Sequence, residues 1–184
     1  MNEIIAYHVV TERPMTVGQH IVFDETNRSG VYQRVTALQE TVADVYANPQ
    51  KYPLPLEHHL DVAIRELALE QVRQERYPQY PSRMGCLYVS REMEAAKRWG
   101  EFFARIGRPT YALVELRVKG RCFVGDACNC FDGTPDLAAN LAQAEHYWQN
   151  LPNVDGTEPI WEMLVDGDIE VVRVVEEINA NLPE

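Results

Sequence analysis

Hydrophobic residues along the chain follow a few regular patterns, and each pattern predicts one kind of element. A continuous apolar run at residues 4–10 is typical of a short buried strand. Gly18 lies within Met-Thr-Val-Gly-Gln-His-Ile-Val-Phe, which predicts a turn at the glycine and a second extended segment through Phe23. Alternation in residues 110–118 predicts a strand whose apolar face is formed by Ala112, Val114, Leu116 and Val118.

Helical spacing governs residues 31–76. Apolar residues at intervals of three and four predict one amphipathic helix, carried by Val31, Val35, Leu38, Val42 and Val45. The same spacing predicts a second helix that runs to about Arg76, carried by Leu56, Leu60, Ile64 and Leu67. Prolines follow both patterns and disfavour helical continuation.

Capping residues mark two further helices. A short strand is expected at residues 86–89, and Ser90 directly after it is placed to cap the next helix, whose apolar face begins at Ala95. Thr134 is the predicted cap of another helix, which continues through a first-turn proline and Asp136 to Trp148.

Apolar strand patterns close the chain. Residues 160–165 and 169–175 read as strands, and Asp-Gly-Asp at 166–168 predicts a hairpin between them. A further short strand is expected within residues 120–127. Because strands and helices do not alternate regularly, the fold class predicted is α+β, in one domain over residues 1–184, and a doubly wound sheet is not expected.

Composition and charge limit the classes of function. Apolar residues make up 46% of the chain and charged residues 24%, as in ordinary soluble globular proteins. The formal net charge of -11 disfavours broad, non-specific binding to nucleic acid, although a small anionic ligand could still bind through local N–H groups. No apolar run is long enough to span a membrane and no export signal is seen, which favours the cytoplasm.

Cysteine and histidine spacing does not predict a metal site. The four cysteines form no two Cys-x-x-Cys pairs, so reduced thiols are expected. His58 and His59 are neighbours on a predicted helix and point in different directions, which makes them a poor chelate.

Three residues stand out from their local patterns. His8 interrupts the first strand, Tyr88 ends a strand just before a helix, and Glu162 interrupts an apolar strand near the C-terminus. Taken one at a time, His8 and Tyr88 are more often packing residues, and Glu162 more often faces solvent by ordinary alternation.

Taken in order, three blocks of sequence resemble the diphtheria-toxin and poly(ADP-ribose) polymerase class of ADP-ribosyltransferases, which has a His-Tyr-Glu set. The first two blocks are also similar to rifampin-modifying ADP-ribosyltransferases of bacteria. The residues that carry the resemblance are His8, Gly18 and Ile21; Gly85, Tyr88, Ala95 and Ala96; and Glu162, Leu164 and Val165. It covers residues 4–23, 83–126 and 160–175 and leaves the helices within residues 31–80 as an insertion. A bacterial family of unknown function with this fold fits the same pattern.

The resemblance implies a split antiparallel sheet with flanking helices and an NAD-dependent mono-ADP-ribosyltransferase. His8 would bind a ribose hydroxyl, the backbone at Val9 the nicotinamide carboxamide, and Tyr88 would stack on the nicotinamide ring. Glu162 would bind the 2′-hydroxyl of the nicotinamide-side ribose and stabilise the positive charge that develops on the sugar. NAD is the only cofactor implied, as a substrate, and no metal.

Two alternatives stay open. The family usually has Gly and then Ser or Thr after its His, where this chain has Val9 and Val10 in what would be the cofactor-binding segment. These valines favour a non-catalytic module that binds a nucleotide or a protein, whereas Glu162 favours an enzyme. The other alternative is a structural protein whose resemblance is accidental, because no single motif is stringent. The sequence does not name the acceptor, which could be a nucleic acid, a protein or a small molecule. Nor does it decide whether the inserted helices gate the cleft, recruit a target or contact an antitoxin-like partner.

Overall fold

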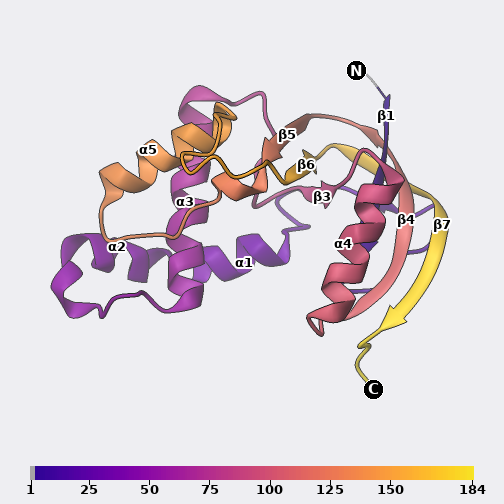
Figure 1. The fold of residues 1–184 in the computed structure, drawn as a ribbon, viewed down its shortest axis with the longest axis horizontal. Helices are drawn as coiled ribbons and strands as arrows, with labels where there is room; N and C mark the ends of the chain where they lie inside the picture. Colours follow the sequence, from indigo (N-terminus) through magenta and orange to yellow (C-terminus); the bar gives the residue numbers. More distant parts are fainter. Residues whose placement is uncertain (1–2) are drawn as a thin grey trace. The chain divides into compact units, whose positions relative to one another are not determined.

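The computed structural model describes residues 3–184, and the chain forms two compact units (Figure 1). The first unit contains residues 3–23, 87–123 and 162–184, and the second contains residues 24–86 and 124–161. The predicted α+β class is confirmed, with five α-helices and two sheets in the described part of the chain. None of the helices within residues 3–184 is long and apolar enough to cross a membrane. The predicted insertion at 31–80 lies entirely within the second unit.

A four-stranded antiparallel sheet forms the body of the first unit. Its order is β1-β4-β7-β2, and its strands are β1 (Glu3–Val10), β4 (Thr110–Lys119), β7 (Asp168–Ala180) and β2 (His20–Ile21). The long strands β4 and β7 curve strongly (Figure 1). Gly18 makes the predicted turn at a φ of 82°, but the extended segment after it is only the two residues of β2. Gly18 and Gln19 also bond to the backbone of Val171, and beyond Val171 no strand within residues 3–184 pairs with the outer edge of β7.

A three-stranded sheet has the order β3-β6-β5, with β3 at Leu87–Val89, β6 at Trp161–Val165 and β5 at Cys122–Asp126. The predicted hairpin at 166–168 is wrong. β6 pairs with β3, whereas β7 pairs with β4 and β2, so the chain changes sheets at this point. A tight turn does form here, with Gly167 at a φ of 95°, but it connects strands of two different sheets rather than two paired strands.

Two such corners pack directly on each other. The chain leaves β4 at Gly120, where an added Cβ would lie 1.9 Å from the carbonyl oxygen of Asp166. At Gly167 an added Cβ would lie 2.5 Å from the carbonyl oxygen of Lys119. Arg121 ties the corners together, because its backbone N–H and its guanidinium both donate to the Asp166 carboxylate, at 3.2 and 2.5 Å. Both corners therefore depend on glycine for their close approach.

Apolar residues cover both faces of the four-stranded sheet. One face builds a core with β3 and β6, in which the predicted alternating set on β4 is fully buried together with Ala6 and Val10. Helix α4 (Met93–Arg105) covers the other face at Val9, through Ala96 and Trp99.

The cap predicted for α4 is wrong. Glu92 is the N-cap residue and makes no side-chain capping bond. Ser90 instead pairs with Tyr7 of β1 through reciprocal backbone hydrogen bonds of 2.8 Å, so it extends a strand rather than beginning a helix.

Helices dominate the second unit. They are α1 (Gly30–Ala37), α2 (Gln39–Ala47), α3 (His58–Arg76) and α5 (Leu137–Trp148), with short 3-10 turns at Pro49–Lys51 and Ala127–Asn129. The single helix predicted over Val31 to Val45 is two helices, because Leu38 leaves helical geometry at φ -103° and ψ 3°. Thr36 donates its hydroxyl to the carbonyl of Tyr32 at 2.7 Å, a bond that tends to bend helices. The apolar set nevertheless packs in one core with α3, as the spacing predicted.

Polar groups fix the remaining details of this unit. Asp136, and not Thr134, caps α5, since its carboxylate accepts from the N–H of Ala139 at 3.1 Å. A buried pair joins Glu66 of α3 to Arg83 at 3.0 Å, and Arg83 also donates to the hydroxyl of Tyr147 at 2.7 Å.

Candidate functional site

The predicted site residues His8, Tyr88 and Glu162 all belong to the first unit, on β1, β3 and β6. β1 is an edge strand of the four-stranded sheet, and the isolated pair between Tyr7 and Ser90 links this edge to β3. All three side chains are partly exposed. The site is therefore built where β1, β3 and β6 come together.

The ladder between β1 and β3 stops after one pair. An antiparallel ladder that continued from Tyr7 and Ser90 would next join Val9 to Tyr88. Instead, the Nδ1 atom of the His8 ring lies 2.8 Å from the carbonyl oxygen of Tyr88. The His8 imidazole thus bonds to β3 at the point where the backbone pairing is not continued.

The hydrogen bond of His8 defines its chemistry. Because a carbonyl oxygen can only accept, Nδ1 carries the proton and donates to Tyr88. Burial of the ring is the main cause that lowers the pKa of His8, and the positive charge of Arg108 acts in the same direction, against the bond to Tyr88 and the charge of Glu12. The ring is consequently neutral at pH 7, and its Nε2 atom is a hydrogen-bond acceptor.

Tyr88 and Glu162 lie on one face of the β3-β6 pair. Tyr88 pairs with Leu164, and Val89 pairs with Met163. The same register, carried one residue further, sets Glu162 opposite Ser90. Cross-strand partners share a face, so Tyr88 and Glu162 are diagonal neighbours at a spacing of about 7–8 Å.

The side chains of Val9 and Val10 do not face a ligand. They are 7% and 1% exposed, and they pack into the cores on opposite faces of the sheet. The backbone of Val9 is placed differently. Since Tyr7 directs its N–H and carbonyl toward β3, Val9, two residues on, directs its own toward the same edge. Val9 could therefore contact a ligand through its backbone alone.

The side chain of His8 lies on a different face from the side chains of Tyr88 and Glu162. His8 shares the face of Ala6 and Val10, whereas Tyr88 and Glu162 lie on the face opposite Leu87 and Val89. The structure thus brings Tyr88 and Glu162 onto a common face, and it joins His8 to them through the Tyr88 carbonyl rather than by a shared face. Sequence reasoning gave the residues but not this arrangement.

Cysteine thiols are the other candidate nucleophiles of the chain. The four cysteines, all within residues 3–184, form no disulfide, and Cys86 is buried. Burial raises the pKa of Cys128, which makes it a poor nucleophile at neutral pH. Within residues 3–184 no three His, Cys, Asp or Glu side chains are grouped closely enough to hold a metal ion.

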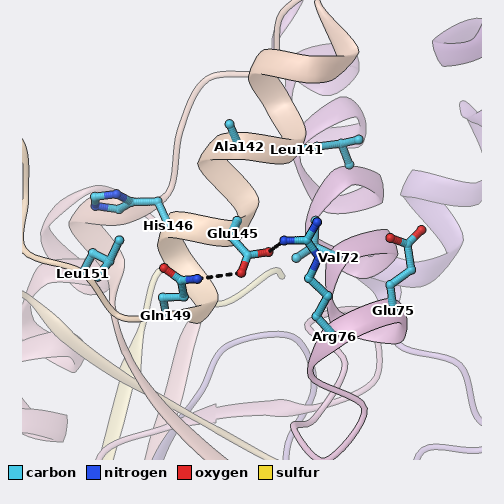
Figure 2. Close-up of a pocket in the computed structure, with 9 residues that line it drawn as sticks. All are labelled: Val72, Glu75, Arg76, Leu141, Ala142, Glu145, His146, Gln149 and Leu151. Carbon is cyan, nitrogen blue, oxygen red and sulfur yellow. Dashed lines mark hydrogen bonds and ion pairs between the residues drawn. The ribbon is translucent and has the colours of Figure 1, made fainter.

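A groove of about 390 Å³ lies between α3 and α5 in the second unit (Figure 2). Figure 2 shows Glu145 at its centre, bonded to Arg76 and Gln149, each at 2.7 Å. Tyr77 also donates to Glu145. The charged groups at the centre of this groove are thus bonded to each other, and the bond from Arg76 to Glu145 links α3 to α5.

A second hollow of about 320 Å³ is formed by the loop between α5 and β6. It includes the buried Asp126 and the exposed Trp161, neither of which sequence reasoning selected. The available signal was Trp161 itself, because a large aromatic residue at the solvent-facing start of a strand is costly to expose.

Comparison with known proteins gives a family and no activity. No curated protein matches the chain. A family model described as "Protein of unknown function (DUF2441)" matches residues 6–179.

Proposed function

The chain belongs to DUF2441, a family of unknown function, and we propose from the geometry of its first unit that it is an NAD-dependent mono-ADP-ribosyltransferase. The observation that carries the proposal is the placement of Tyr88 and Glu162 as diagonal neighbours on one face, with His8 bonded to the Tyr88 carbonyl. These residues were selected by their order in the sequence, and they are distant along the chain. If the resemblance in sequence were accidental, there would be no reason for the three residues to lie at one junction of strands, so their placement supports the proposal.

The spacing of Tyr88 and Glu162 suits the nicotinamide riboside half of NAD. A nicotinamide ring stacked on Tyr88 would carry its ribose toward Glu162, over a distance that diagonal neighbours span. The carboxylate would accept from the ribose 2′-hydroxyl and stabilise the positive charge that develops at the anomeric carbon. The Val9 backbone, directed at the open edge of β1, offers an N–H and a carbonyl to the carboxamide.

His8 would act as a fixed acceptor. Its Nδ1 proton is committed to Tyr88, so Nε2 can accept a hydrogen bond from a ribose hydroxyl of the dinucleotide. In the reaction the bond between nicotinamide and the ribose breaks, and nicotinamide leaves with the electron pair. The acceptor then forms its bond to the anomeric carbon and loses a proton.

The second candidate is a non-catalytic module that binds a nucleotide or a protein. The observation that favours it is the full burial of Val9 and Val10, where the resembling enzymes have Gly and a hydroxyl residue. Without that hydroxyl, the dinucleotide would have one contact fewer.

Calorimetry with NAD⁺ and an assay of nicotinamide release separate these candidates. We expect NAD⁺ to bind and nicotinamide to be released, and Glu162→Gln to abolish release while binding persists. Glu177→Gln is the matched control, because Glu177 is an exposed carboxylate on β7 of the same unit. Binding without release by the wild type would favour the module. Equal release by the wild type and Glu162→Gln would refute the proposed role of the carboxylate.

A further inference from the structure

The hollow in the second unit is organised around a buried carboxylate. Asp126 is 3% exposed, and it accepts from the backbone N–H groups of Cys128 and Ile160, each at 2.9 Å. The side-chain amide of Asn153 donates to its other oxygen at 2.6 Å and to the carbonyl of Thr157 at 3.0 Å. One carboxylate thus fixes a loop that has no helix or strand of its own, so the hollow is preformed.

The charge of Asp126 is not balanced by a cation. The groups that donate to it are neutral, and within residues 3–184 no Lys, Arg or His forms an ion pair with it. Buried carboxylates are normally paired with a positive charge, because isolated burial is costly. Neutral donors relieve that cost in part and leave a negative potential in the hollow.

The charged residues that line the hollow are both acidic. Ten residues line it, and none of them is Lys, Arg or His, while Glu158 adds a second carboxylate at its exposed rim. Trp161 is the one aromatic side chain, and it is 54% exposed. An exposed indole beside carboxylates is the arrangement that attracts organic cations, since the ring face and the carboxylates both carry negative potential.

We propose that this hollow binds an organic cation, an alkylammonium or guanidinium group, against Trp161 and the carboxylate of Glu158, in the negative potential of the buried Asp126. Its volume of about 320 Å³ is enough for such a group with a short chain attached. The cation would complete the charge balance of Asp126 through space, and Glu158 would contact it at the rim. This site shares no residue with the proposed transferase site, although Trp161 directly precedes Glu162 on β6.

The test is an NMR titration that follows the indole N–H of Trp161, with the indoles of Trp99 and Trp148 as internal references. The first probe is choline, and its matched control is 3,3-dimethyl-1-butanol, which has the same shape without the charge. We expect choline to bind at least about tenfold more tightly than the alcohol, and its binding to weaken as salt is added. Equal affinity for the two probes would overturn the proposal, as would no shift of the Trp161 signal with choline.

Two variants test the residues. Trp161→Leu and Glu158→Gln are each expected to weaken choline binding several-fold, and both residues are exposed, so the fold should be retained. Glu40→Gln is the control, an exposed carboxylate on α2 outside the hollow. Unchanged binding in both Trp161→Leu and Glu158→Gln would place the cation elsewhere and refute the assignment.

A second pair of probes identifies the source of the cation. Capped arginine and capped trimethyllysine carry the same cationic groups on a polypeptide backbone. Tighter binding of either one than of choline indicates a side chain of a protein partner, and tighter binding of choline indicates a free small amine. Both results support the site.

Discussion

Gly120 lies where two corners of the chain make their closest approach, and its replacement by alanine is the sharpest test of that packing. The added Cβ would lie 1.9 Å from the carbonyl oxygen of Asp166. Ordinary contact begins near 3.4 Å, so one corner must move by about 1.5 Å, the difference between these values. Backbone atoms lie on both sides, so no side-chain rotation can relieve the contact.

The expected loss in the free energy of unfolding has two parts, overpacking at the corner and the weakening of hydrogen bonds across it. Overpacking of this kind costs about 1–3 kcal/mol. Opening the corners also strains two hydrogen bonds of 3.2 Å, from the Arg121 N–H to the Asp166 carboxylate and from the Asp166 N–H to the Arg121 carbonyl. Each contributes about 1 kcal/mol. The free energy of unfolding should therefore fall by roughly 3–5 kcal/mol.

Gly18→Ala is the matched control in the same unit. Gly18 has a φ of 82° and nothing within 4 Å of an added Cβ, so alanine meets only the backbone penalty of about 1–2 kcal/mol. Urea denaturation followed by far-UV circular dichroism measures both variants, with the free energy extrapolated to water. If Gly120→Ala costs no more than Gly18→Ala, the two corners do not pack as described.

Three further predictions concern titration, the buried ion pair and a helix cap. The pKa of His8 lies below its usual value of 6.5, mainly through burial, whereas a hydrogen bond to an aspartate raises that of His20. The unfolded state therefore binds more protons at His8, and the protein loses stability as pH falls through 6.5 and below; His8→Asn should lessen this loss. The folded state binds more protons at His20, so His20→Gln should lessen the stability lost as pH rises above 6.5. Equal profiles of stability against pH in the wild type and both variants would contradict this. Glu66→Ala removes the carboxylate that pairs with the buried Arg83 guanidinium and should lower the free energy of unfolding by about 3–5 kcal/mol in urea denaturation. A loss below about 1 kcal/mol would contradict the pairing. Asp136→Ala removes the N-cap of α5 and should lower the free energy of unfolding by about 1 kcal/mol. An unchanged free energy would mean that Asp136 is not the capping residue.

The sequence predicted best those elements whose pattern is local. Helix α3 ends at Arg76 as its spacing indicated, and the alternating face of β4 is buried as expected. Hydrophobic periodicity decides such elements because each has one face against a core. The break at Leu38 was missed because both helices keep their apolar residues on one core, so periodicity continues across it.

Local sequence patterns could not predict features that depend on partners distant along the chain. Ser90 has the composition of a cap, but its backbone pairs with Tyr7, more than eighty residues earlier in the chain. Asp166 and Gly167 have the composition of a hairpin, yet the strands on either side pair in different sheets. Strand register is likewise non-local, so the order of His8, Tyr88 and Glu162 indicated a site while their relative placement required the structure.

The uncovered edge of β7 has a consequence for how the protein behaves in concentrated solution. A long strand with one open edge is a template on which a second molecule can add its own strand, and this is how many aggregates begin. Two features oppose it here: the strand is interrupted by irregular pairing with β4, and adjacent glutamates at positions 176 and 177 are exposed on it. Like charges would be brought together if two copies paired edge to edge, so these carboxylates oppose the addition of a second copy to the sheet.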